Sequence, residues 1–410
     1  IQQGKWREAG DALERAARGP GLTAALRARV HLSLARCYER LGYEDRQLAA
    51  ARAAVAAQPA SAPARAGLAA LLLSAGLTGE AAAQYRSLAA LPDAPEGAWT
   101  QLARALLRHN LELSPRDRNW GEATRALGRA ARVPGQVGAV AALRAELLVA
   151  EGQAEEGRAA LEAARRQYPK ELTVWTASAD LALRDGRPAD ALGLLEAAGE
   201  GLGLRLARAD FWAGQGGPIA ARMLDELTEG LESYSAEDRL RVLYYVAERQ
   251  AWLGNRPEVV RLCGEIAARR PEDLRGRLLL VEVSLSAGND RSAARAVADL
   301  RRAEGEAGAC WRYGEAARLL AAAARGDRGG LPQARALLAE VARRRPGWAR
   351  VPALEARAEE AEGRPDRALA AYLRAIELGD RNPAVLRRAA QLLAERGRRA
   401  EADAVLRKAA

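Results

Sequence analysis

The chain has 410 residues, of which 49% are hydrophobic and 4% aromatic, and 63 basic against 53 acidic residues give it a formal charge of +10. Its apolar side chains are mostly alanine and leucine, which favour helices, whereas the β-branched and aromatic residues typical of strands are scarce. This composition excludes a β-rich fold and predicts an all-α one. Because one hydrophobic core rarely serves more than about 300 residues, the chain holds either several domains or a repeat array.

The positive charge is spread along the chain rather than gathered in one basic tail. Arginine accounts for 60 of the 63 basic residues, and many arginines stand beside Asp or Glu. The bias towards Arg, Ala, Gly and Pro is typical of a GC-rich, bacterial genome, so nucleic acid is disfavoured as a partner. No apolar stretch is long enough to span a bilayer. The compartment, bacterial cytoplasm or periplasm, and the oligomeric state stay open.

Short turns recur with a period of 34 residues, which indicates stacked helix-turn-helix units. In each unit a glycine permits the left-handed turn that ends the first helix, here called helix A. A proline such as Pro188 suits the first turn of the second helix, helix B. The glycines 34 residues apart are the pairs Gly42 and Gly76, Gly152 and Gly186, Gly254 and Gly288, and Gly363 and Gly397.

A small residue stands at a fixed position of helix B, where a larger side chain would push helices A and B apart. With alanines in helix A, closing prolines such as Pro169 and aromatic residues such as Trp175, this pattern resembles the tetratricopeptide repeat family over essentially the whole chain. The array is degenerate, with about eleven to twelve repeats. The resemblance implies an all-α, right-handed superhelical solenoid of antiparallel helix pairs. The helix B alanines are Ala81, Ala123, Ala191, Ala293, Ala368 and Ala402.

The spacing of these signals divides the chain into four parts. Residues 1–27 hold a partial first repeat, with helix B only, and a linker. Residues 28–137 hold the N-terminal repeats, with an insertion near 111–118 where Ser114 and Pro115 interrupt a helix. Residues 138–311 hold the central repeats and 312–410 the C-terminal ones. Because neither end carries a polar cap, we expect the chain to be a piece of a longer protein.

No arrangement of residues points to catalysis, a cofactor or a metal. His31 and His109 lack a carboxylate or thiol partner at a fixed spacing, and neither a phosphate-binding loop nor a nucleophile elbow is present. Cys37, Cys263 and Cys310 are far apart and are predicted to be small buried hydrophobic residues rather than disulfide partners. We therefore do not expect an enzyme.

The resemblance implies that helix A lines the concave, peptide-binding surface of the solenoid. At one equivalent position, five consecutive repeats carry a carboxylate, and aromatic residues fall beside this strip. One hypothesis is that the strip binds a basic segment through charge pairing and cation-π contacts. The alternative, which stays open, is that arginines such as Arg184 and Arg241 neutralise it. The strip and its aromatic neighbours are Glu146, Asp180, Asp210, Glu248, Glu282, Tyr244, Tyr245, Trp252 and Trp212.

Together these features favour a protein-protein interaction scaffold that binds a peptide segment or a partner protein in the concave groove. Two alternatives are left open by the residues. One is a periplasmic scaffold of an outer-envelope assembly or polysaccharide-export system, and the other is the regulatory repeat region of a larger multidomain enzyme.

Overall fold

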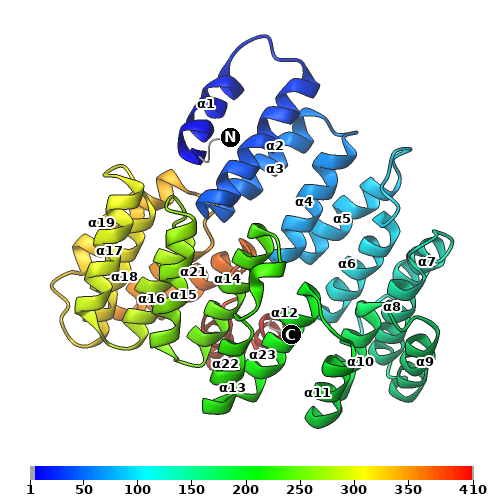
Figure 1. The fold of residues 1–410 in the computed structure, drawn as a ribbon. Coiled ribbons are helices and arrows are strands. Elements are labelled where there is room, and N and C mark those ends of the chain that lie inside the picture. The colour runs from blue at the N-terminus through cyan, green and yellow to red at the C-terminus, as the bar shows by residue number, and fades with distance from the viewer. Residues whose placement is uncertain (1–4, 409–410) are drawn as a thin grey trace. The chain divides into compact units, whose positions relative to one another are not determined.

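The computed structural model describes residues 5–408, and helices account for nearly all of its regular structure (Figure 1). No strand occurs between residues 5 and 408, so the prediction of an all-α fold is confirmed. None of the helices in that range is both long and apolar enough to cross a membrane. After the N-terminal helix α1 (Trp6–Arg18), the helices follow one another as A and B pairs.

The even-numbered helices are the A helices of the repeats. They are α2 (Ala24–Leu41), α4 (Ala62–Ser74), α6 (Ala98–Glu112), α8 (Val137–Ala150), α10 (Leu172–Arg184), α12 (Leu202–Gln215), α14 (Ala236–Trp252), α16 (Arg275–Ser286), α18 (Cys310–Ala324), α20 (Arg350–Ala361) and α22 (Pro383–Glu395).

The odd-numbered helices after α1 are the B helices. They are α3 (Glu44–Ala57), α5 (Thr78–Ala89), α7 (Gly121–Ala130), α9 (Ala154–Gln167), α11 (Pro188–Ala197), α13 (Gly217–Glu226), α15 (Arg256–Arg269), α17 (Asp290–Glu304), α19 (Leu331–Arg344), α21 (Pro365–Glu377) and α23 (Arg399–Arg407). A short 3-10 turn, η1 (Leu231–Ser233), precedes α14.

The repeat signals lie where the helix pairs need them. All eight turn glycines have a positive φ, from 67° at Gly288 to 90° at Gly152, in the left-handed region that favours glycine. All six helix B alanines are buried, with at most 5% of their surface exposed at Ala402. In the pairs that carry these residues, the two helices therefore close through a tight turn and cross at a short distance. Only α6 and α7, which residues 113–120 separate, pack weakly against each other.

Contacts group the described residues into two compact units, whereas the four-part division above was drawn from repeat spacing. Unit 1 comprises residues 5–94, 108–118 and 270–408, and unit 2 comprises 95–107 and 119–269. Unit 1 holds 43 basic and 30 acidic residues, a net charge of +13, whereas unit 2 holds 20 and 23, a net charge of −3. The basic character of the chain thus belongs to unit 1 alone.

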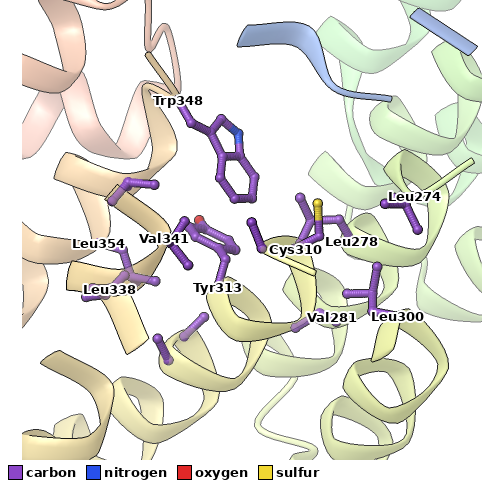
Figure 2. Close-up of a cluster of buried hydrophobic side chains, with 14 of the residues drawn as sticks. Leu274, Leu278, Val281, Leu300, Cys310, Tyr313, Leu338, Val341, Trp348 and Leu354 are labelled. Carbon is purple, nitrogen blue, oxygen red and sulfur yellow. The ribbon is translucent and has the colours of Figure 1, made fainter. Parts of the chain in front are cut away.

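The largest apolar core of unit 1 joins α16 to α20 with residues of α2 and α3. Figure 2 shows Trp348 over the ring of Tyr313, and the two ring centroids are 4.7 Å apart. Cys310 lies in this core beside Leu278. All three cysteines are buried, and none forms a disulfide within residues 5–408, as expected for small hydrophobic residues.

Candidate functional site

The residues of the predicted acidic strip lie on the A helices of successive repeats. Glu146 on α8, Asp180 on α10, Asp210 on α12 and Glu248 on α14 belong to unit 2. Glu282 on α16 belongs to unit 1, where it forms an ion pair with Arg350. The candidate site is therefore built from the unit 2 residues alone.

Asp210 is held by two side chains of the next repeat. Its Oδ1 accepts hydrogen bonds from Nε of Arg249 at 3.0 Å and from Nη2 of Arg249 at 2.7 Å, and its Oδ2 accepts one from the Tyr245 hydroxyl at 2.6 Å. The Arg249 guanidinium also lies 3.4 Å from the ring centroid of Tyr245 and 4.7 Å from that of Trp252. We call Asp210, Tyr245, Arg249 and Trp252 the open cluster.

The helical period explains how α14 supplies three members of the open cluster. Tyr245, Arg249 and Trp252 are four and three residues apart, so they share one face of the helix. Burial, followed by the hydrogen bond to Asp210, raises the pKa of Tyr245, so its hydroxyl stays protonated and donates at neutral pH. The hydrogen bonds to Asp210 thus fix the orientation of the Tyr245 hydroxyl and of the Arg249 guanidinium.

The members of the open cluster differ in their access to solvent. The Arg249 side chain is only 10% exposed and that of Asp210 is 51% exposed. Trp252, at the end of α14, is 65% exposed. The Arg249 side chain is therefore shielded from solvent, whereas the Trp252 ring and part of the Asp210 carboxylate are exposed to it.

Asp180 extends this surface towards α10. It is exposed, and among residues 5–408 its carboxylate takes part in no ion pair. The surrounding repeats nevertheless reduce its hydration, and this desolvation raises its pKa; Arg184 opposes the shift and the Asp210 charge adds to it. A carboxylate in this position is ready to accept a hydrogen bond from a cation that arrives from outside the protein.

The other predicted site residues have different surroundings. Glu248 lies 3.5 Å from Arg249, Glu146 is half-buried, and Tyr244 is 8% exposed and belongs to the core. Trp212 packs edge-on against Phe211, with ring centroids 5.0 Å apart, and lines an apolar groove of about 350 Å³ between α11, α12 and α13. The structure therefore does not bring Trp212 into the open cluster.

A second cluster with the same four residue types lies in unit 1. Nε of Arg345 donates to Asp45 Oδ1 at 3.0 Å, and its guanidinium lies 3.7 Å from the ring centroid of Trp348 and 4.9 Å from that of Tyr43. Here the Arg345 and Asp45 side chains are 1% and 5% exposed, and Trp348 is 5% exposed. We call these residues the covered cluster.

Sequence reasoning missed the arginine at the centre of each cluster. Arg249 is 39 residues from Asp210, and Arg345 is 300 residues from Asp45. The one local signal was available on α14, because an arginine between Tyr245 and Trp252 at helical spacing is placed to stack on both rings. No comparable signal links Asp45 to Arg345.

Comparisons with known proteins leave the family of the chain open. No protein-family model matches the chain, and no curated protein matches it. A monomeric mutant of IFIT1 with Gppp-AAAA is 16% identical, with a TM-score of 0.32, over 92% of this chain and 88% of that one. The Cut9-Hcn1 hetero-tetramer of the APC/C is 13% identical, with a TM-score of 0.35, over 100% of this chain and 78% of that one.

The human IFIT1 dimer with m7Gppp-AAAA gives similar values, 16% identity and a TM-score of 0.32, over 92% of this chain and 87% of that one. At such TM-scores the overlap carries no argument about function or partner. The helical-repeat fold therefore rests on the paired helices, turn glycines and crossing alanines of the chain itself.

Proposed function

We propose that the chain is a helical-repeat scaffold that binds an extended segment of a partner protein, and that the open cluster with Asp180 is part of its binding surface. The observation that carries this proposal is the contrast between the two clusters. In unit 1, residues of the chain's own N-terminal repeats complete and cover the Arg345 cluster. In unit 2 the same residue types leave Trp252 in solvent.

Tryptophan, tyrosine and arginine are the residue types most enriched among those that dominate binding at protein interfaces. The open cluster combines them in one place. Arg249 is already fixed by Asp210 and by two rings, so little side-chain entropy remains to be lost when a ligand arrives. The Trp252 ring offers a large area to an apolar or aromatic side chain of that ligand.

The charges of unit 2 favour a segment that contains Arg or Lys. Asp180 presents a carboxylate without an ion pair in the described chain, and unit 2 as a whole carries 23 acidic against 20 basic residues. Glu248 and Asp210 are engaged by Arg249, so they shape the surface and Asp180 is left to pair with the ligand. A ligand segment that places a basic side chain at Asp180 and an apolar side chain on Trp252 would complement this surface.

Selection of peptides from a random library on the immobilised full chain tests this function. We expect enrichment of sequences in which Arg or Lys stands near an aromatic or large aliphatic residue. Asp180→Arg should weaken binding of a selected peptide at least about tenfold, because charge reversal places two cations together. The matched control is Glu232→Arg, an exposed acid of the same unit. Peptides without basic residues, or equal affinity for both variants, would contradict the proposal.

A further inference from the structure

The first repeats of unit 1 contact its last ones, although hundreds of residues separate them. The Leu274 amide donates to the Leu41 carbonyl at 3.2 Å, and the Trp6 amide donates to Glu272 Oε2 at 2.8 Å. Arg381 donates to the Gly76 carbonyl. Residues 5–94 and 270–408 therefore form one continuous contact, which we call the self-contact.

Turns and loops supply many of the hydrogen bonds of the self-contact. Tyr43 and Gly76 lie in the turns between helices A and B of the first repeats, and Leu41 is the last residue of α2. Their partners lie mainly in the loops that join one repeat to the next, such as residues 345–349 and 379–382. By contrast, no helix of residues 5–94 is a closely packed neighbour of a helix of residues 270–408. The self-contact therefore lacks the interlocked helices that join consecutive repeats.

Beside the apolar core that joins its two sides, the self-contact has a polar region. An open pocket of about 220 Å³ lies there, lined by arginines such as Arg7 and Arg345 and by carboxylates such as Glu14 and Glu304. Because this pocket is open and its walls are charged, its polar groups can be hydrated. Water can enter this polar region at a smaller cost than it can enter the apolar core of the self-contact.

The covered cluster fixes the register of the self-contact. Arg345 and Asp45 are both almost fully buried, and a Cβ added to Gly347 would lie 3.9 Å from Asp45 Cβ. When one partner of a buried ion pair is neutralised, the other is left as an unpaired charge, so the closed arrangement loses much of its stability. Separation of the two loops would return both groups to water.

We propose that the self-contact is a latch with a closed and an open state, and that Asp45 and Arg345 are its lock. Opening separates residues 5–94 from 270–408 while the helix pairs on each side stay folded. The loops at 345–349 and 379–382 then become accessible surface. This latch is independent of the binding function proposed for unit 2, because no residue of the open cluster takes part in it.

Cys310 is a natural probe for the latch. Nη1 of Arg345 lies 3.2 Å from its sulfur, and the thiol is buried at the self-contact. Cys263, buried on α15 in unit 2, reports global unfolding instead. Labelling the folded full chain with a maleimide, and measuring each cysteine by peptide mass spectrometry, separates opening of the latch from unfolding.

The variant Asp45→Asn removes the charge of the lock and keeps the shape of the side chain. We expect Cys310 to be labelled at least about tenfold faster than in the wild type, with the rate at Cys263 unchanged. Asp366→Asn is the matched control, since Asp366 also lies in the first turn of a helix B and pairs with an arginine, Arg396, away from the self-contact. In this control neither cysteine should change.

Two results would overturn the latch. An unchanged labelling rate at Cys310 in Asp45→Asn would show that the ion pair does not hold the contact closed. An equal rise at Cys310 and Cys263 would show that the contact unfolds only with the whole chain. As a second variant, Arg381→Gln removes the hydrogen bond to Gly76 from the same contact and should also accelerate Cys310 selectively.

Discussion

The two clusters use the same four residue types, Asp, Arg, Tyr and Trp, and differ in what covers them. In the covered cluster the tryptophan is 5% exposed, and in the open cluster it is 65% exposed. Both arginines stack on both of their aromatic neighbours and pair with their aspartate. The difference shows that this arrangement is completed within the chain in unit 1 and left partly exposed in unit 2, where we propose that a partner binds it.

The charge of the two units sharpens this contrast. Unit 1, at +13, contains the covered cluster, and unit 2, at −3, contains the open one. The overall charge of +10 therefore gives the wrong sign for the proposed binding surface. A partner attracted to unit 2 is expected to be basic, even though the chain as a whole is basic too.

Replacing the tryptophan of each cluster should give the largest difference in stability between the two clusters. Trp348→Ala should lower the free energy of unfolding by about 3 to 5 kcal/mol, because the ring fills a core and leaves a cavity behind. Trp252→Ala should change it by less than about 0.5 kcal/mol, as an exposed substitution does. Urea unfolding followed by circular dichroism measures both. A large loss from Trp252→Ala would mean that the open cluster supports the fold rather than a partner.

Overpacking a crossing of helices A and B should lower the stability by a similar amount in the two units, in contrast to the tryptophan substitutions. Ala191 in unit 2 and Ala368 in unit 1 are both fully buried where helices A and B meet. Replacing either with Leu should overpack the crossing and destabilise the chain by about 1 to 3 kcal/mol. The same unfolding experiment tests this, and a cost in only one unit would show that the repeats are not built equivalently.

Replacing a turn glycine with alanine should cost more stability in a turn of the self-contact than in a turn with no neighbours. Gly186→Ala should cost about 1 to 2 kcal/mol, because φ is +71° and nothing crowds the added methyl group. Gly76→Ala should cost more, since φ is +68° and the Arg381 side chain lies 2.5 Å from the added Cβ. Thermal unfolding of both variants compares them, and a smaller effect at Gly76 would argue that Arg381 is not held there.

The smallest expected effect concerns Asp180. Because its folded-state pKa is raised, its contribution to stability is fully present below the unfolded pKa near 3.9 and is lost as the pH rises through the folded-state value. Asp180→Asn should therefore raise the melting temperature at pH 7, by about 1 °C once solvent screening of an exposed group is considered. The gain should vanish near pH 3, and a loss at pH 7 would contradict the raised pKa.

The repeat architecture could be predicted from sequence because its signals are local. A glycine such as Gly186 and a proline such as Pro188 specify a turn within a few residues, and a small residue such as Ala191 marks the crossing that follows. The period of 34 then repeats this information along the chain. The helix pairs, their turns and the all-α class can therefore be predicted without knowing any contact between residues distant in the sequence.

The site could be predicted only in part, because its chemistry depends on contacts between repeats. Asp210 and Trp212 are two residues apart, yet two residues turn a helix through about 200°, so Asp210 meets α14 whereas Trp212 lines the apolar groove. The pairing of Arg345 with Asp45 lies beyond any repeat period. Such contacts follow from how repeats stack, which the spacing of turns does not determine.

The most direct test of the central claim is the affinity of a selected peptide for the full chain, measured by fluorescence polarisation. Trp252→Ala should weaken binding at least about tenfold, as for an aromatic residue at the centre of an interface. Ile219→Ala, which alters the exposed edge of the apolar groove, should leave the affinity unchanged. Unchanged binding in Trp252→Ala with loss in Ile219→Ala would place the partner in the groove and contradict the account of the open cluster.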